Sequence, residues 1–229
     1  MSDLNIVDWS VRELFAPIEI LPGLVVCVDD VEPPRDGSAV IFLKRGESFG
    51  TGAHPATRAI IYEFLGYLSW VNDDNRHMLE GRRLLDYNCG TGLIALIAKA
   101  VFPEMEVLAV ADKKDHWTAG ENMTLNHATE EIGVRSMPSF RRPGQLKRSA
   151  GTFDYIITQA ADPAIELMAN LMSEEGVLFY GGHNAQIHHP MKNRIEQFFN
   201  VLNVDDMLGW PVIRAEKKPP ANGGHDPYR

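Results

Sequence analysis

The stretch from Asp86 to Gly92 has the residue types expected of a loop that holds a nucleoside. It reads Asp-Tyr-Asn-Cys-Gly-Thr-Gly and joins an apolar, strand-like run to a helix-like run. Gly90 and Gly92 would let the backbone approach a ligand closely, with amides at a helix start pointing at that ligand. The next strand-like run ends at Asp112, 20 residues after Gly92, where a carboxylate can accept hydrogen bonds from ribose hydroxyls. We therefore interpret this unit as a nucleoside-cofactor site.

The loop alone leaves two classes of nucleoside open. The segment from Gly90 to Ala95 also fits the dinucleotide pattern Gly-x-Gly-x-x-Ala, so NAD competes with an adenosyl cofactor. Asp86, at the end of the strand, can meet an amine of the cofactor, which favours the adenosyl class. A dinucleotide fold also requires a second mononucleotide-binding half after this unit. An NAD-linked oxidoreductase therefore stands as the alternative function.

A second glycine motif runs from Glu47 to Thr57 and ends 29 residues before Asp86. It reads Glu-Ser-Phe-Gly-Thr-Gly-Ala-His-Pro-Ala-Thr and leads into a run with helical periodicity. Pro55 suits the first turn of a helix, where free amides favour an anion. Its position ahead of the Asp86 loop indicates that the two motifs share one site.

Alternating strand-like and helix-like runs surround both motifs and predict one sheet. The strand-like runs are 83–87, 107–112, 153–158 and 176–180, and two more strands are expected between 201 and 215 around Gly209. The helix-like runs are 55–68, 93–101, 115–127, 164–172 and 186–199. Continuous apolar strands that alternate with helices are typical of a parallel sheet covered on both faces. The carboxyl ends of such strands meet at one edge, where ligands bind.

The chain divides into three parts by composition. Residues 1–45 form an N-terminal extension, in which the apolar runs 24–28 and 39–43 flank breaker residues and predict a β-hairpin. Residues 46–217 form the α/β domain. Residues 218–229 are rich in proline and glycine and are expected to be a mobile tail.

Composition excludes several classes of function. The 229 residues include 31 acidic and 22 basic ones, and the net charge of −9 argues against a nucleic-acid surface. No apolar run reaches about 18 residues, and the start of the chain lacks the features of a secretory signal. The two cysteines cannot form a disulfide framework, so we expect a cytoplasmic protein with reduced thiols. No metal site is predicted, because the histidines between 183 and 189 lack a complementary cysteine or acid. The oligomeric state is unknown.

Taken together, the two motifs resemble those of the PrmA-type ribosomal-protein methyltransferases, which are class I S-adenosylmethionine-dependent enzymes. The resemblance spans about residues 20–217 and is carried by the runs 49–57, 84–92, 111–112 and 153–154. It implies a Rossmann-like α/β fold with a mostly parallel seven-stranded sheet and helices on both faces, so that residues 46–217 are the methyltransferase domain. It further implies S-adenosylmethionine as cofactor and N-methylation of a protein or small-molecule acceptor.

The resemblance also assigns cofactor contacts, and these fall on Phe49, Thr51, Thr57, Asp86, Asn88, Gly90, Gly92 and Asp112. Asp86 and Asp112 would hold the amine and the ribose of the cofactor. The glycines would allow its close approach, and the residues of the first motif would close the site.

Three features depart from the family pattern. Asn88 stands where the family has the first glycine of its loop, and asparagine can adopt the positive φ although its side chain crowds the cofactor. Gln159 stands where the family has an asparagine; it keeps an amide and is the predicted catalytic residue, which would orient the acceptor. Only 45 residues precede the domain, too few for the family's N-terminal substrate domain, which we expect this chain to lack. These departures keep open a third function, a non-catalytic protein that binds the cofactor.

Overall fold

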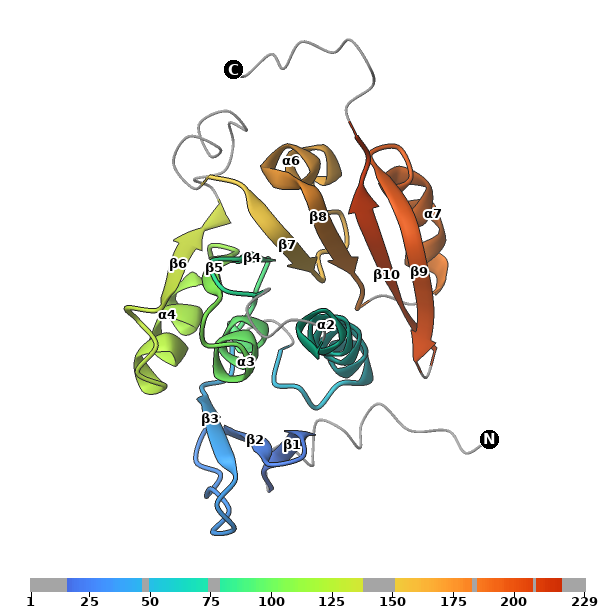
Figure 1. Ribbon diagram of the computed structural model, residues 1–229. Helices are drawn as coiled ribbons and strands as arrows, with labels where there is room; N and C mark the ends of the chain where they lie inside the picture. Colours follow the sequence, from blue (N-terminus) through green and yellow to red (C-terminus); the bar gives the residue numbers. More distant parts are fainter. Residues whose placement is uncertain are drawn as a thin grey trace.

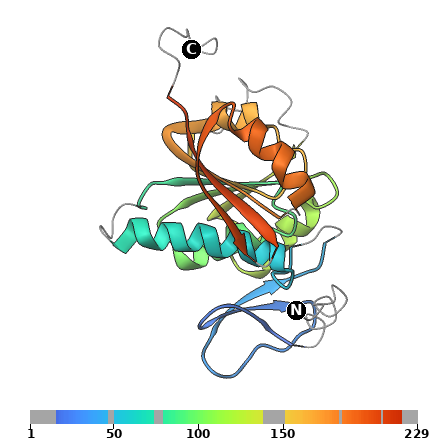
Figure 2. The ribbon, with the colours of Figure 1, turned by 90° about the vertical axis from the view of Figure 1, so that its right-hand side faces the viewer.

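The computed structural model describes residues 16–46, 50–73, 79–137, 151–182, 185–207 and 209–219. Within these residues the chain forms two sheets, one of three strands and one of seven (Figure 1). The small sheet has the order β1-β2-β3 and consists of β1 (Ile18–Leu21), β2 (Leu24–Val28) and β3 (Ala39–Leu43). A layer of helices lies between the small sheet and the large sheet, as a view turned by 90° shows (Figure 2).

The large sheet is mostly parallel and has the order β6-β5-β4-β7-β8-β10-β9. Its parallel strands are β4 (Arg83–Tyr87), β5 (Glu106–Ala111), β6 (Ile132–Ser136), β7 (Phe153–Thr158) and β8 (Met172–Tyr180). Strand β10 (Trp210–Lys217) runs antiparallel to both β8 and β9 (Phe199–Met207). This sheet confirms the predicted α/β fold.

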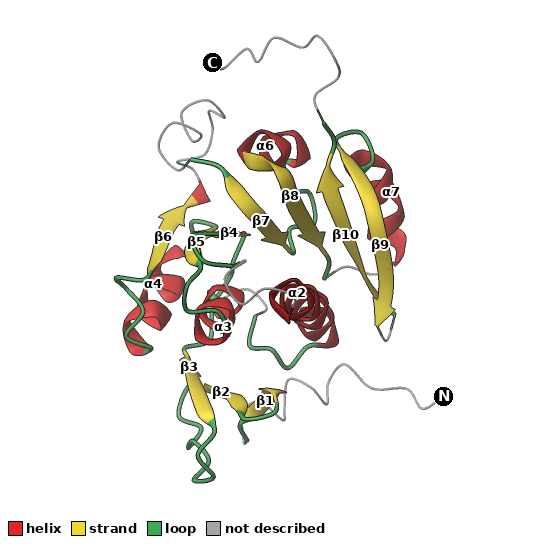
Figure 3. Ribbon diagram, viewed as in Figure 1, coloured by secondary structure: helices red, strands yellow, loops and turns green. Residues whose placement is uncertain are grey.

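Helices cover both faces of the large sheet (Figure 3). They are α2 (Pro55–Asp73), α3 (Leu93–Val101), α4 (His116–Leu125), α6 (Ile165–Leu171) and α7 (Ala185–Ile195). Two adjacent residues of β4 point into separate cores: Leu84 joins the cluster that contains α2 and α3, and Leu85 joins the cluster that contains α6 and α7. Successive side chains of a strand point to opposite faces, so a continuously apolar strand feeds both cores.

The hairpin predicted between residues 24–28 and 39–43 is wrong, because β2 and β3 pair in parallel, from Leu24 opposite Ala39 to Val28 opposite Leu43. The ten-residue connection 29–38 carries the chain back to the start of β2, whereas a hairpin reverses direction in a short turn. The antiparallel partner of β2 is β1, which joins it around Gly23 at a φ of 79°.

The small sheet packs onto the α/β domain through a shared core. Its buried residues Ile20, Val26 and Leu43 belong to the same hydrophobic cluster as Ile60 of α2 and Leu93 of α3. No helix in the described part of the chain combines the length and the apolar character needed to cross a membrane.

Candidate cofactor site

The loop between β4 and α3 follows a path that glycine-like backbone conformations make possible. Asn88, Gly90 and Gly92 have φ values of 64°, 55° and 82°, all in the left-handed region. A Cβ on Gly92 would lie 2.4 Å from Cε of Met123, so a side chain there would collide with α4. The amide of Cys89 donates to the carbonyl oxygen of Val110 at 2.9 Å, which fastens the loop to the end of β5. The loop therefore lies at the carboxyl edge of the sheet, as predicted.

Asp86 lies behind this loop, in the penultimate position of β4. Its carboxylate is buried and accepts a hydrogen bond from the amide of Ala95, in the first turn of α3, at 3.1 Å. Burial raises the pKa of Asp86 to about 7. A positive group placed beside the carboxylate would lower that pKa again. The structure thus gives Asp86 a role in holding the start of α3, and its predicted contact with the cofactor's amine stays a prediction.

Asp112 follows β5, the strand next to β4, and its carboxylate is half-buried. Its Oδ1 accepts a hydrogen bond from the amide of Lys113 at 2.5 Å. Because Tyr87 pairs with Val110, Asp112 and the glycine loop leave the sheet at the same level on neighbouring strands. This is the position that contact with a ribose requires.

The second glycine motif lies against the first. The hydroxyl of Thr91 donates to the carbonyl oxygen of Gly50 at 2.6 Å, which joins the two motifs directly. Gly52 has a φ of 83°, and a Cβ there would lie 2.6 Å from Cδ1 of Ile20. Thr51 and Thr57, which follow Gly50 in the same motif, are both buried. Phe49, the remaining predicted contact of this motif, lies outside the described residues.

His54 belongs to the second motif and directly precedes α2. Its Nδ1 accepts a hydrogen bond from the amide of Ala56 at 3.1 Å, and its carbonyl oxygen accepts one from the amide of Thr57 at 3.1 Å. The imidazole packs edge-on against Trp210, with ring centroids 4.7 Å apart. Burial lowers the pKa of His54, which favours the neutral ring that this acceptor role needs. His54 therefore satisfies amides in the first turn of α2.

Gln159 follows β7, the neighbour of β4 on the side away from β5. Its side chain lies against Gly182, where a Cβ would come within 2.7 Å of Nε2 of Gln159. The amide of Gly181 donates to the carbonyl oxygen of Thr158 at 3.2 Å and keeps the two strand ends together. Asp112, the glycine loop and Gln159 thus follow three adjacent strands, β5, β4 and β7.

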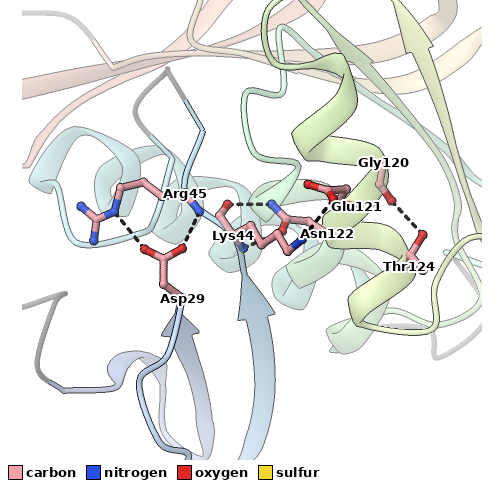
Figure 4. A network of polar contacts seen from close by, with 7 residues as sticks. All are labelled: Asp29, Lys44, Arg45, Gly120, Glu121, Asn122 and Thr124. Carbon is pink, nitrogen blue, oxygen red and sulfur yellow. Dashed lines mark hydrogen bonds and ion pairs between the residues drawn. The ribbon is translucent and has the colours of Figure 1, made fainter.

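Two residues of this region were not predicted, Thr91 and Asn122. Both are buried, and Nδ2 of Asn122 donates to the carbonyl oxygen of Thr91 at 2.9 Å. Asn122 lies on α4 and also binds the backbone of Lys44, the residue after β3 (Figure 4). It therefore connects the glycine loop to the small sheet. The only signal in the sequence was a pair of asparagines spaced four residues apart on one helix.

Comparisons with known proteins agree on one family. The family model described as ribosomal protein L11 methyltransferase (PrmA) matches residues 1–218. The ribosomal protein L11 methyltransferase of Caldanaerobacter subterraneus subsp. tengcongensis is 26% identical over 225 residues, which cover 95% of this chain and 67% of that protein. The one from Thermotoga maritima is 30% identical over 151 residues, which cover 66% and 49%. The chain thus spans between half and two thirds of the length of these relatives.

A solved structure has the same fold. The crystal structure of ribosomal protein L11 methylase from Lactobacillus delbrueckii subsp. bulgaricus aligns with a TM-score of 0.65 at 19% identity and covers 89% of this chain and 100% of that chain. None of these comparisons supports an NAD-linked oxidoreductase. The match of the family model along nearly the whole chain agrees with the resemblance carried by the two glycine motifs. The chain therefore belongs to the PrmA family of S-adenosylmethionine-dependent methyltransferases.

Proposed function

We propose that this chain transfers a methyl group from S-adenosylmethionine to an amine nitrogen of a protein acceptor, and that ribosomal protein L11 is the first acceptor to test. The observation that carries the proposal is the left-handed loop from Asn88 to Gly92, which lies at the carboxyl edge of the sheet between Asp86 and Asp112. The names of the curated relatives support the choice of acceptor.

The residues of the loop fit the cofactor. Gly90 and Gly92 present no side chain where the backbone would approach it. Asp112 would accept hydrogen bonds from the ribose hydroxyls, and Asp86 would face the amine while it holds α3. Asn88 has a φ of 64°, a left-handed conformation that glycine also adopts, so the departure from the family pattern is compatible with a tight loop.

The acceptor side is assigned to Gln159. When bound, S-adenosylmethionine supplies an electrophilic methyl group on a sulfonium. The amide oxygen of Gln159 would accept a hydrogen bond from an N–H of the incoming amine. This bond would point the nitrogen lone pair at the methyl group, because methyl transfer depends on alignment of the reacting atoms. An ammonium nitrogen has no lone pair, so the amine must lose a proton before it attacks. A glutamine cannot accept that proton, which therefore passes to water. The contact with Gly182 restrains the side chain for this task.

The test is a transfer assay with isotopically labelled S-adenosylmethionine and purified L11, read by mass spectrometry of the acceptor. We expect label on L11 from the wild-type chain and less label from the Asp112→Ala variant at a cofactor concentration below its dissociation constant. Label on other proteins of a cell lysate but not on L11 would overturn the choice of acceptor. Cofactor binding without transfer to any protein would instead favour the non-catalytic function.

A binding assay separates the cofactor classes independently of the acceptor. A ligand that binds only the folded chain adds about 2.7 kcal/mol to its stability at about 100 times the dissociation constant. We therefore expect S-adenosylmethionine to raise the melting temperature and NAD to leave it unchanged. A shift with NAD alone would contradict the proposed function.

A further inference from the structure

Asn122 on α4 and Asn126, directly after the helix, bind the backbone of β3 and of the residue beyond it as a neighbouring strand would. Asn126 accepts from the amide of Phe42 at 2.8 Å and donates to its carbonyl oxygen at 2.6 Å. Asn122 accepts from the amide of Lys44 at 2.6 Å and donates to its carbonyl oxygen at 3.1 Å (Figure 4). Four residues rise about 6 Å along a helix and two rise about 6.6 Å along a strand. The spacings match, so both side chains reach the same strand edge.

Asn122 differs from Asn126 because it also binds the glycine loop. Its Nδ2 also donates to the carbonyl oxygen of Thr91 at 2.9 Å, and the hydroxyl of Thr91 donates in turn to the carbonyl oxygen of Gly50 at 2.6 Å. A chain of hydrogen bonds thus runs from Lys44 through Asn122 and Thr91 to Gly50. Asn122 and Thr91 are fully buried, so a broken bond in this chain has no water to replace its partner.

Other contacts of the same junction are weaker. Lys44 pairs with Glu121 at 3.0 Å and Arg45 pairs with Asp29 at 3.3 Å, but both ion pairs are exposed to solvent (Figure 4). Exposed ion pairs contribute little to stability. Together with the shared hydrophobic core, the buried amide bonds therefore hold the small sheet against the glycine loop.

We infer that Asn122 is a positioning residue for the cofactor, which it affects through Thr91. Its hydrogen bonds hold the glycine loop next to the second glycine motif and connect both to the end of β3. The inference rests on the cofactor site proposed above. It assigns to Asn122 an effect on cofactor affinity that Asn126, with its equivalent grip on the strand, does not have.

The test compares Asn122→Asp with Asn126→Asp. Aspartate keeps the shape of asparagine and removes its N–H donors, so both variants lose a bond to a carbonyl oxygen of the strand segment and both lower the melting temperature. Each variant also loses a second bond: in Asn126→Asp it is the bond to the carbonyl oxygen of Asn122 at 2.7 Å, and in Asn122→Asp it is the bond to Thr91. We expect the dissociation constant of S-adenosylhomocysteine, measured by calorimetry, to rise at least about fivefold in Asn122→Asp, as for the loss of one buried hydrogen bond. In Asn126→Asp it stays within about twofold of the wild type.

A second pair of variants decides the question if Asn122→Asp does not fold. Thr91→Val removes the hydroxyl that binds Gly50 and keeps the shape, whereas Thr91→Ser keeps the hydroxyl. We expect weaker binding in the first and wild-type binding in the second. For each weakened variant the KM for S-adenosylmethionine should rise more than kcat falls, because the chain of bonds does not touch the acceptor side.

Two results would overturn the inference: equal weakening in the Asn122 and Asn126 variants, or wild-type affinity in Asn122→Asp. If Asn122→Asp does not fold, wild-type affinity in Thr91→Val overturns it. Failure of the proposed function looks different. In that case the wild-type chain does not bind S-adenosylhomocysteine, or the Asp112→Ala variant binds it as tightly as the wild type does.

Discussion

The most direct test of the cofactor loop is the substitution Gly92→Ala. Gly92 has a φ of 82°, and the left-handed conformation costs a residue with a Cβ about 1–2 kcal/mol. The new Cβ would also lie 2.4 Å from Cε of Met123, a residue that is 1% exposed and therefore has little room to move. Overpacking of this kind costs about 1–3 kcal/mol. We expect Gly92→Ala to lower the free energy of unfolding by about 2–5 kcal/mol in total.

Two other glycines separate these contributions. Gly81 has a φ of 70°, and a Cβ added there would have no atom within 4 Å, so Gly81→Ala reports the backbone strain alone, a loss of about 1–2 kcal/mol. Gly66 lies within α2, also in open space and without a positive φ, so Gly66→Ala should raise stability by about 0.5–1 kcal/mol. Urea denaturation followed by circular dichroism measures all three variants under the same conditions.

The collision with Met123 also predicts that the substitutions Gly92→Ala and Met123→Ala are not additive. In the double variant with Met123→Ala, the space that the new methyl group needs is vacant, so the two substitutions should together cost less than the sum of their separate effects. If Gly92→Ala proves no more destabilising than Gly81→Ala, or if the double variant is strictly additive, the proposed contact between the glycine loop and α4 does not constrain the loop.

Three more predictions concern the chemical groups of the site. Asp112→Ala should weaken binding of S-adenosylmethionine about 10-fold or more, with little change in melting temperature because the side chain is half-buried; calorimetry measures both. The pKa of Asp86 in the folded chain is raised to about 7, so between about pH 4 and pH 7 the folded state binds the extra proton and stability falls as the pH rises. The Asp86→Asn variant should lose this slope in denaturation curves taken across that range, and an unchanged slope would mean that another group titrates there. Gln159→Ala should lower kcat without raising the KM for S-adenosylmethionine, whereas Gln159→Asn, which restores the family's residue, should retain turnover; steady-state kinetics would contradict the assigned role if both variants were equally active.

The local structure of the cofactor loop could be predicted because several signals coincide there. Strand β4 and helix α3 begin and end at the predicted residues, since a continuously apolar strand is followed by glycines and then by a run of alanine, leucine and isoleucine that stops before Pro103. Strand β6 was missed for the opposite reason. Its five residues include a glycine and an arginine, and only Ile132 is buried, so it lacks the apolar pattern of its neighbours.

Contacts between distant segments could not be predicted from patterns within each segment. The parallel pairing of β2 with β3 depends on where a ten-residue connection returns the chain, which the apolar runs themselves do not specify. The grip of Asn122 on Lys44 joins residues 78 positions apart, and a polar residue within a helix otherwise suggests a surface position. The contact of Gln159 with Gly182 likewise depends on β7 and β8 being neighbours. Each requires the tertiary fold.

Asn122 on α4 and Asn126 at its end also have a consequence for solubility. Strand β3 is the last strand of its sheet, and such a strand offers unpaired N–H and C=O groups to which another polypeptide can add. Asn122 and Asn126 occupy the groups of Lys44 and Phe42 that would otherwise serve as that template. The two asparagines thereby cover the edge of β3, where strands from other copies of the protein could add and cause aggregation.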